Sequence, residues 1–363
     1  MGENTTISWT HHTFNPWWGC VPVSPACANC YAETFAERFP ETRGLWGKNS
    51  ERRFFGEKYW SQPLKWNKKI DRVFACPCGA FRQQYLASVP PRCDKCGAQP
   101  TQVRERVFCA SMADVFEDRP ELTPHRARLF DIIRKTPHLD WMLLTKRPEN
   151  IMRMLLHCRD ISFSETRMML TEWTHQSNPT PPANVWLGTT VENQDMADKR
   201  IPELMKIPAR IRFLSCEPLL GPVGLLHIRA PFRDTIGDEL YFKDLIHWVI
   251  CGGESGRNAR PMHPAWARSL RNQCAVSVPF HFKQWGEWIP ECTGNSDFPD
   301  GSTLPDNWRK HANKYACVSV NGERTTGYSG RGEVFVKHVS TRAAGRLLDG
   351  ILHDAFPPNT LTC

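Results

Sequence analysis

The feature that most constrains the fold of this chain is an alternation of short apolar runs with stretches of helical periodicity after residue 100. Six runs rich in β-branched and aromatic residues occupy residues 106–111, 139–145, 184–190, 211–216, 247–251 and 279–283. Apolar residues recur at helical spacing between them, at residues 124–135, 149–158 and 264–274. Strands that alternate with helices form βαβ units and a parallel sheet. We therefore predict an α/β fold, with a further strand near residues 14–19.

Polar residues, or glycines that let a ligand approach the backbone, come directly after these runs. They are Ser111 and Asp114, Lys146 and Arg147, Thr190, Glu192 and Asn193, Ser215 and Glu217, Gly252 and Gly253, and Lys283. In a βα barrel, the carboxyl ends of the strands carry the active site. No GxGxxG or Walker pattern follows any run, which argues against nucleotide-binding folds of those types. We expect a partial (βα)6-type or TIM-like barrel in preference to an open doubly wound sheet.

The domain organisation follows from the segments that break the alternation. Residues 66–104 surround a cysteine cluster, and residues 286–332 are rich in Gly, Pro, Asn and Asp. We expect residues 1–285 to form the barrel, with a zinc-ribbon insertion at 66–104. Residues 286–363 are expected to form an accessory lobe that ends in a helix near residues 341–353.

Cysteine usage and charge narrow the functional classes. The chain has 15 cysteines in 363 residues, and its first residues, MGENTTISWT, lack the basic and apolar regions of a secretory signal. We therefore expect a cytoplasmic protein without a disulfide scaffold. No run of about 18 apolar residues occurs, so no membrane span is expected. The formal net charge of +8 favours an anionic partner such as nucleic acid, although a basic soluble enzyme would have the same balance.

Three cysteines near the N-terminus have the spacing of a metal-binding loop. Cys20, Cys27 and Cys30 form a C-x6-C-x2-C pattern between the first expected strand and a helix that starts at about residue 31. Three thiolates without a fourth cysteine nearby suit a [4Fe–4S] cluster with one iron open to a small ligand. Zinc with His11 or His12 as fourth ligand is an alternative, as is a group of buried structural thiols.

Several motifs resemble a known family. The segment WTHHTFNPWWGCVPVSPACANCYAE, together with FCASMADVF, LTKRPEN, NVWLGTTVEN, RFLSCEPL, WVICGGESG and FKQWGEW, resembles a three-cysteine-motif family of phages and prophages that is of unknown function. The resemblance spans roughly residues 7–286. Through its cysteine loop this family in turn resembles the radical S-adenosylmethionine (SAM) superfamily, whose usual spacing is C-x3-C-x2-C.

The resemblance implies a mechanism and a set of site residues. A [4Fe–4S] cluster on the three cysteines would bind SAM and, with an electron from a donor protein, generate a 5′-deoxyadenosyl radical. The strand-end residues implied as SAM contacts are Ser111, Asp114, Thr190, Glu192, Asn193, Ser215, Glu217, Gly252 and Gly253. Lys283 and Cys216 are the candidate catalytic residues. A strand-end lysine that points into a barrel mouth is costly unless it is paired or used, and Cys216 is either a hydrogen-atom donor to a substrate radical or a buried structural cysteine. Lys146 and Arg147 would neutralise a phosphate or the SAM carboxylate, or form a solvated cap at the start of a helix.

A second cysteine cluster lies in the expected insertion. Cys76, Cys78, Cys93 and Cys96 form a C-x-C-x14-C-x2-C pattern, and a glycine follows each pair. Four protein thiolates close a tetrahedral site, which is typical of structural zinc. A second iron–sulfur cluster or unliganded thiols are the alternatives.

Two functions of different classes therefore remain open. The first is a radical SAM enzyme that modifies a nucleic-acid base, in DNA rather than RNA, or a nucleotide. This matches phage DNA hypermodification of the isomerase or lyase type, which would take place in the host cytoplasm. The alternative is a zinc-stabilised nucleic-acid-binding protein without catalysis, in which both clusters hold zinc.

Overall fold

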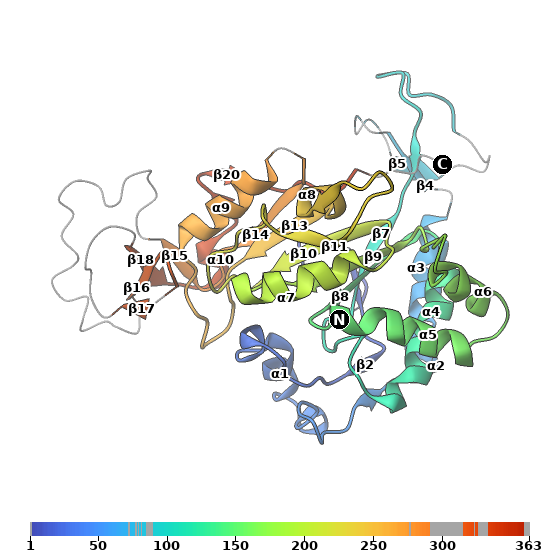
Figure 1. Ribbon diagram of the computed structural model, residues 1–363, viewed down its shortest axis with the longest axis horizontal. Helices are drawn as coiled ribbons and strands as arrows, with labels where there is room; N and C mark the ends of the chain where they lie inside the picture. The colour runs from blue at the N-terminus through green and yellow to red at the C-terminus, as the bar shows by residue number, and fades with distance from the viewer. Residues whose placement is uncertain are drawn as a thin grey trace.

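The computed structural model describes residues 2–71, 73–76, 78, 80, 82–84, 90–275, 277–290, 315–322, 324–325 and 333–358. Its main body is a seven-stranded parallel sheet that curls into a half-barrel (Figure 1). The strands follow one another in chain order: β1 (His12–Phe14), β7 (Glu105–Cys109), β8 (Leu139–Thr145), β9 (Val185–Thr190), β10 (Ile211–Cys216), β13 (Trp248–Gly252) and β14 (Phe280–Gln284). The α/β class is therefore confirmed, in the form of a curled, barrel-like sheet.

All six apolar runs become strands of this sheet, but the first strand lies earlier in the chain than the strand expected near residues 14–19. β1 ends at Phe14, and residues 17–18 instead form β2 (Trp17–Trp18), which pairs antiparallel with β3 (Arg53–Phe54). Pro16 stands between the two strands and has no N–H to donate to a ladder. The chain therefore leaves the main sheet just before the cysteine loop begins.

Helices cover the convex face of the sheet and bury its main core. They are α3 (Gln62–Ile70), α4 (Thr123–Lys135), α5 (Ile151–Ile161), α6 (Ser164–Trp173), α7 (Gln194–Met205) and α9 (Pro264–Cys274). Because strand side chains alternate between faces, Val107, Leu143 and Leu187 pack with these helices while their neighbours point inward. Burial on both faces explains why the strands are apolar along most of their length.

The concave face carries a smaller core of its own. Phe108, Met142, Trp186, Phe213 and Trp248 project inward from successive strands. Gly188 allows this packing, because a Cβ atom there would lie 2.4 Å from the Phe213 ring. The interior of the half-barrel is therefore filled below the carboxyl ends of the strands.

Segments from the two ends of the chain close the open side of the half-barrel. Trp9 packs into the concave core, with its ring centroid 6.5 Å from that of Trp248. The Phe356 ring lies 5.1 Å from the other side of Trp248, whose indole N–H donates to the Ala355 carbonyl. These contacts bring a residue that precedes β1 and residues near the C-terminus onto Trp248 of β13.

The remaining elements form peripheral units. The insertion contains a small antiparallel sheet of β4 (Val73–Ala75), β5 (Arg82–Gln84) and β6 (Thr101–Gln102). Since α3 carries Trp66 and Ile70 into the main core, this unit begins after Ile70. The other short elements are α1 (Tyr31–Ala36), α2 (Glu57–Trp60), β11 (Arg229–Arg233), β12 (Glu239–Tyr241) and α8 (Phe242–Leu245), with one-turn helices at Pro25–Cys27, Pro40–Thr42, Pro120–Leu122 and Pro148–Asn150.

The C-terminal part contains a four-stranded antiparallel sheet. Its strands are β15 (Trp288–Pro290), β16 (Tyr315–Ser319), β17 (Arg324–Thr325) and β18 (Glu333–His338). The helix expected near residues 341–353 is limited to α10 (Thr341–Ala344), and the hairpin β19 (Leu347–Leu348) and β20 (Ile351–Leu352) follows. Gly345 ends the helix with φ of 72°, a conformation in which glycine is favoured.

Candidate functional site

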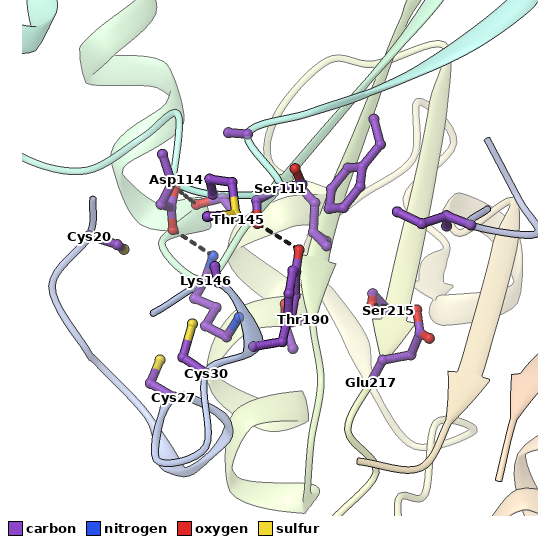
Figure 2. A pocket seen from close by; sticks show the side chains of 18 of the residues that line it. Cys20, Cys27, Cys30, Ser111, Asp114, Thr145, Lys146, Thr190, Ser215 and Glu217 are labelled. Atoms are coloured by element: carbon purple, nitrogen blue, oxygen red, sulfur yellow. Dashed lines mark hydrogen bonds between the residues drawn. The ribbon is translucent and has the colours of Figure 1, made fainter. Parts of the chain in front are cut away.

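A cavity of about 450 Å³ opens at the carboxyl edge of the curled sheet. One wall is the loop that carries Cys20, Cys27 and Cys30 (Figure 2). The opposite wall includes Ser215, at the end of β10, and Glu217, which follows this strand. Its volume lies within the range of small-molecule sites. The three cysteines therefore share one cavity with several, but not all, of the strand-end polar residues.

The three thiols are half-buried and are spread around the loop. Among the residues that the structure describes, only one group of three or more His, Cys, Asp or Glu side chains has all its ligand atoms within 4.8 Å of one another, and this group lies elsewhere. The sulfur atoms of Cys20, Cys27 and Cys30 are therefore not all within 4.8 Å. Thiolates on one tetrahedral zinc lie about 3.8 Å apart, from a Zn–S distance of about 2.3 Å. As positioned, the three sulfur atoms are therefore less compact than the thiolates of one tetrahedral zinc ion.

Burial keeps two of these thiols neutral. Burial and, to a lesser extent, the Asp114 carboxylate raise the pKa of Cys20 to about 12, although the Arg147 guanidinium opposes the shift. Burial also raises the pKa of Cys30, against the backbone N–H groups at the start of α1 and the Lys146 ammonium. Since thiolates rather than thiols bind metals, loading of the loop would release protons.

A buried ion pair anchors the start of the cysteine loop. The Asp114 carboxylate accepts hydrogen bonds from Arg147 Nη1 at 2.7 Å, from Thr145 Oγ1 at 2.7 Å and from the Lys146 N–H at 3.0 Å. Arg147 in turn donates to the Val21 carbonyl at 2.6 Å. Although burial opposes ionisation, Arg147 and these hydrogen bonds hold the pKa of Asp114 below its usual value. Asp114 thus lines the cavity, but its hydrogen-bonding capacity is used by the protein.

A second ion pair lies across the cavity. Lys283 Nζ, from β14, is 2.9 Å from Glu217 Oε1, and the Ser215 hydroxyl donates to Glu217 Oε2 at 3.3 Å. The Lys283 and Glu217 side chains are 27% and 11% exposed, and both line the cavity. Lys146 also lines the cavity, and within the described chain its ammonium has no carboxylate partner. The site therefore offers one free cation and one exchangeable ion pair.

The remaining cofactor-binding predictions divide into two groups. Ser111, Asp114, Thr190, Ser215 and Glu217 line the cavity. The structure places Glu192, Asn193, Gly252 and Gly253 outside its lining.

Each of the residues outside the lining has a structural partner. Glu192 is fully buried and pairs with Arg200, and Asn193 caps α7 by accepting from the Met196 N–H. A Cβ atom on Gly253 would lie 1.9 Å from the Trp285 carbonyl oxygen, so this glycine is required by packing. A Cβ atom on Gly252 would meet Glu217 Oε1 at 3.1 Å.

Cys216 lies on the opposite face of the sheet from the cavity. It is fully buried in the main core next to the helices, and burial raises the pKa of its thiol well above the usual value. Its neighbour Ser215 faces the cavity, and adjacent strand residues point to opposite faces. The structure therefore does not bring Cys216 to the site as a hydrogen-atom donor, whereas Lys283 is placed there.

The structure adds residues that the sequence analysis did not select. Tyr31 lines the cavity and donates its hydroxyl to the Ser111 carbonyl at 2.6 Å. Trp9, Phe108 and Leu144 provide an apolar part of the lining. Arg346 lines it from the C-terminal segment and donates to the Lys283 carbonyl at 2.8 Å. The alternation of β7 and β8 could have indicated Phe108 and Leu144, whereas nothing local in the sequence places Arg346.

A second cavity, of about 730 Å³, adjoins the first. The two share Thr6, Ile7, Tyr31, Ser111, Met112 and Ser255 in their linings. Arg38 and Arg257 line the second cavity, both are exposed, and neither has a carboxylate partner among the described residues. The cysteine-lined cavity therefore adjoins a larger one whose lining includes two arginines without a carboxylate partner among the described residues.

The four cysteines of the insertion form the compact group mentioned above. The sulfur atoms of Cys76, Cys78, Cys93 and Cys96 all lie within 4.8 Å of one another. Cys76 Sγ is 3.1 Å from Cys78 Sγ and 3.4 Å from Cys96 Sγ. The group can hold a metal ion, as its spacing predicts, and both zinc and iron–sulfur chemistry are compatible with four thiols.

The fold and the site define an α/β protein with a cysteine-lined cavity at the carboxyl edge of a curled parallel sheet. The chain belongs to the family described as "Protein of unknown function (DUF5131)", whose model matches residues 4–357. No curated protein and no solved structure matches the chain. Within the part of the chain that the structure describes, no helix has the length and apolar character needed to cross a membrane.

Proposed function

We propose that this protein is a radical SAM enzyme whose cluster is held by Cys20, Cys27 and Cys30. The observation that carries the proposal is the position of these thiols. They lie on one loop, line a cavity at the carboxyl edge of a curled parallel sheet, and do not form the compact group of sulfur atoms found in the insertion. When bound, a [4Fe–4S] cluster and SAM, with an electron from a donor protein, supply a 5′-deoxyadenosyl radical that removes a hydrogen atom from a substrate.

The residues of the cavity then bind and orient SAM. The Lys146 ammonium is the free cation beside Cys30, so it pairs with the SAM carboxylate. Thr190 and Ser215 present hydroxyl groups from neighbouring strands to the ribose. Trp9 and Phe108 give an apolar surface that excludes water from the reacting atoms.

The substrate that we propose is a nucleic-acid base, in DNA rather than RNA, or a nucleotide. The second cavity provides room beside the cysteine-lined one, and Arg38 and Arg257 there can pair with phosphate. The Lys283–Glu217 pair lines the cysteine-lined cavity, and in this proposal Lys283 holds or transfers a proton on the substrate there. The resemblance to a phage family supports base hypermodification of the isomerase or lyase type.

We further propose that Cys76, Cys78, Cys93 and Cys96 hold one structural zinc ion. Their sulfur atoms are already close to the mutual distances that a tetrahedral Zn–S₄ site requires. All four ligands come from the protein, which leaves no open position for a substrate. The zinc site therefore serves the stability of the insertion.

Anaerobic purification and reconstitution test the proposed function. The wild-type protein should be brown, with about four iron atoms and one zinc per chain, and should convert SAM to 5′-deoxyadenosine when reduced with dithionite. Replacing Cys27 with Ala should abolish iron uptake and leave the zinc. Cys274→Ala is the matched control, because Cys274 is buried in the main core and lines neither cavity. A colourless protein with two zinc ions would instead support the nucleic-acid-binding alternative.

A further inference from the structure

The cysteine loop has little internal structure of its own. Between Cys20 and Cys30 it contains only the one-turn helix Pro25–Cys27, and Pro22 and Pro25 cannot donate backbone hydrogen bonds. Holding such a segment in one conformation costs backbone entropy at every residue. The loop must therefore be held by contacts from elsewhere in the fold.

Three buried charged residues supply such contacts, and each comes from a different strand end. Arg147, two residues after β8, donates to the Val21 carbonyl and lies 3.8 Å from Cys20 Sγ. Glu192, two residues after β9, accepts from the Ala26 N–H at 3.3 Å. Glu254, two residues after β13, accepts from the Asn29 side-chain amide at 3.0 Å.

The three contacts match the three cysteines one to one. Arg147 holds the residue after Cys20, Glu192 holds the residue before Cys27, and Glu254 holds the residue before Cys30. Their side chains are nearly inaccessible: Arg147, Glu192 and Glu254 are 7%, 0% and 5% exposed. None of the three is left as an isolated buried charge.

Each charge is neutralised by a fixed partner, which also sets its direction. Arg147 pairs with Asp114 at 2.7 Å, and Glu192 pairs with Arg200 at 2.8 Å. Glu254 accepts three hydrogen bonds from Arg260, through its backbone N–H, Nε and Nη2. Because these pairs restrict rotation of the side chains, the groups that reach the loop are oriented before any ligand binds.

We propose that Arg147, Glu192 and Glu254 are positioning residues that together hold the cysteine loop in its metal-binding shape. This assigns Glu192 a role through the loop rather than through SAM. The consequence for a cluster rests on the proposed function, whereas the shape of the metal-free loop does not. The two can therefore be tested separately.

The test uses variants directed at one contact each that leave no unpaired buried carboxylate. Asn29→Ala removes the loop side of the third contact, together with the hydrogen bond that the same amide donates to the Asn258 carbonyl at 2.8 Å, and keeps the Glu254–Arg260 pair. Arg147→Lys keeps the positive charge near Cys20 but loses the guanidinium group, whose two Nη atoms donate to Asp114 and to the Val21 carbonyl. Asp140→Asn is the control, because Asp140 is a buried carboxylate paired with Arg104 at the amino end of β8.

The first measurement is the alkylation rate of each thiol in the metal-free full-length protein, read by peptide mass spectrometry. Asn29→Ala should raise the rate at Cys30 about tenfold, as expected for loss of a hydrogen bond to a charged group, and leave Cys20 unchanged. Arg147→Lys should raise the rate at Cys20 and leave Cys30 unchanged. Asp140→Asn should lower the melting temperature without changing the ratio of the rates at the three cysteines.

The second measurement is the rate at which reconstituted protein loses its visible absorption in the presence of a chelator. Faster loss in Asn29→Ala and Arg147→Lys than in Asp140→Asn is the expected result. If the variants change site-specific alkylation but neither they nor the wild type takes up iron, the positioning role of the three residues stands and the cluster assignment fails. If iron binds and neither rate differs from that of Asp140→Asn, the positioning role is overturned.

Discussion

Replacing Asp114 with Asn tests whether the ion pair beside Cys20 stabilises the fold. Asp114 is 5% exposed and accepts hydrogen bonds from Arg147, Thr145 and the backbone N–H groups of Lys146 and Phe116. The substitution removes the negative charge and leaves the Arg147 guanidinium, 7% exposed, without its partner. Breaking a buried pair from one side typically costs about 3–5 kcal/mol. We expect the free energy of unfolding to fall by about that amount.

The adjacent segment provides a matched control. Asp118 pairs with Arg153 at 2.8 Å, but these side chains are 60% and 45% exposed. An exposed pair contributes about 0–1 kcal/mol, so Asp118→Asn should change the stability by less than a third as much. Urea unfolding followed by tryptophan fluorescence compares the two variants. Equal stabilities for Asp114→Asn and Asp118→Asn would refute the argument that burial makes the first pair costly to break.

The lowered pKa of Asp114 also predicts how its contribution to stability changes with pH. Because the pKa of Asp114 is lower in the folded protein than its ordinary value of 3.8, its contribution is complete above that value and is lost as the pH falls through the lowered pKa. The stability difference between wild type and Asp114→Asn should therefore be constant near neutral pH and shrink only in strong acid. A difference that shrinks between pH 8 and pH 6 would assign the effect to another group.

Three further predictions concern other parts of the molecule. Cys96→Ser should remove about one zinc per chain and speed proteolysis within residues 71–104, while the unfolding of the main sheet stays unchanged; simultaneous loss of the sheet would refute a local structural role. Burial lowers the pKa of His281 to about 4 from 6.5, so the free energy of unfolding of the wild type should fall by up to about 1.4 kcal/mol for each unit that the pH drops between 6.5 and 4. His281→Gln should flatten this slope, whereas the surface variant His227→Gln should leave it in place. Binding of a short DNA should weaken steeply as salt rises, and less steeply in Arg257→Gln, because each neutralised phosphate releases counterions; salt-independent binding would contradict a phosphate contact.

The strands could be predicted well because their apolar runs are long and are punctuated by polar residues. β8 has the expected bounds, and β9, β10, β13 and β14 differ by a residue at most at either end. Such runs are governed by burial on both faces, which is a local property of the sequence. The prediction of a terminal helix near residues 341–353 was wrong. Gly345 and Gly350, which lie within that segment, adopt positive φ angles, and the chain forms a hairpin there instead.

For the site, the sequence predicts which residues follow the strands, but not which of their side chains line the cavity. Ser215 and Cys216 are neighbours in a strand, so the rule of alternation could have separated the cavity residue from the core residue. Glu192 could not be separated in this way, because its partner Arg200 lies two turns along the following helix and its contact with Ala26 is 166 residues away in sequence. Side-chain partnerships of this kind depend on tertiary packing, which periodicity does not describe.

The two cysteine groups differ in how far apart in sequence the residues that hold them lie. This difference bears on how each site forms. In the insertion, the Cys93 N–H donates to the Ala98 carbonyl and the Gly97 N–H donates to the Cys93 carbonyl, with Gly97 at φ of 70°. This turn brings Cys93 and Cys96 together through contacts within six residues. The Cys20–Cys30 loop is instead held from the ends of three strands that are more than 100 residues away. Half of the insertion site is therefore built by a local turn and the other half comes from a segment within 20 residues of it, whereas we expect the cavity loop to reach its binding shape only after the parallel sheet has formed.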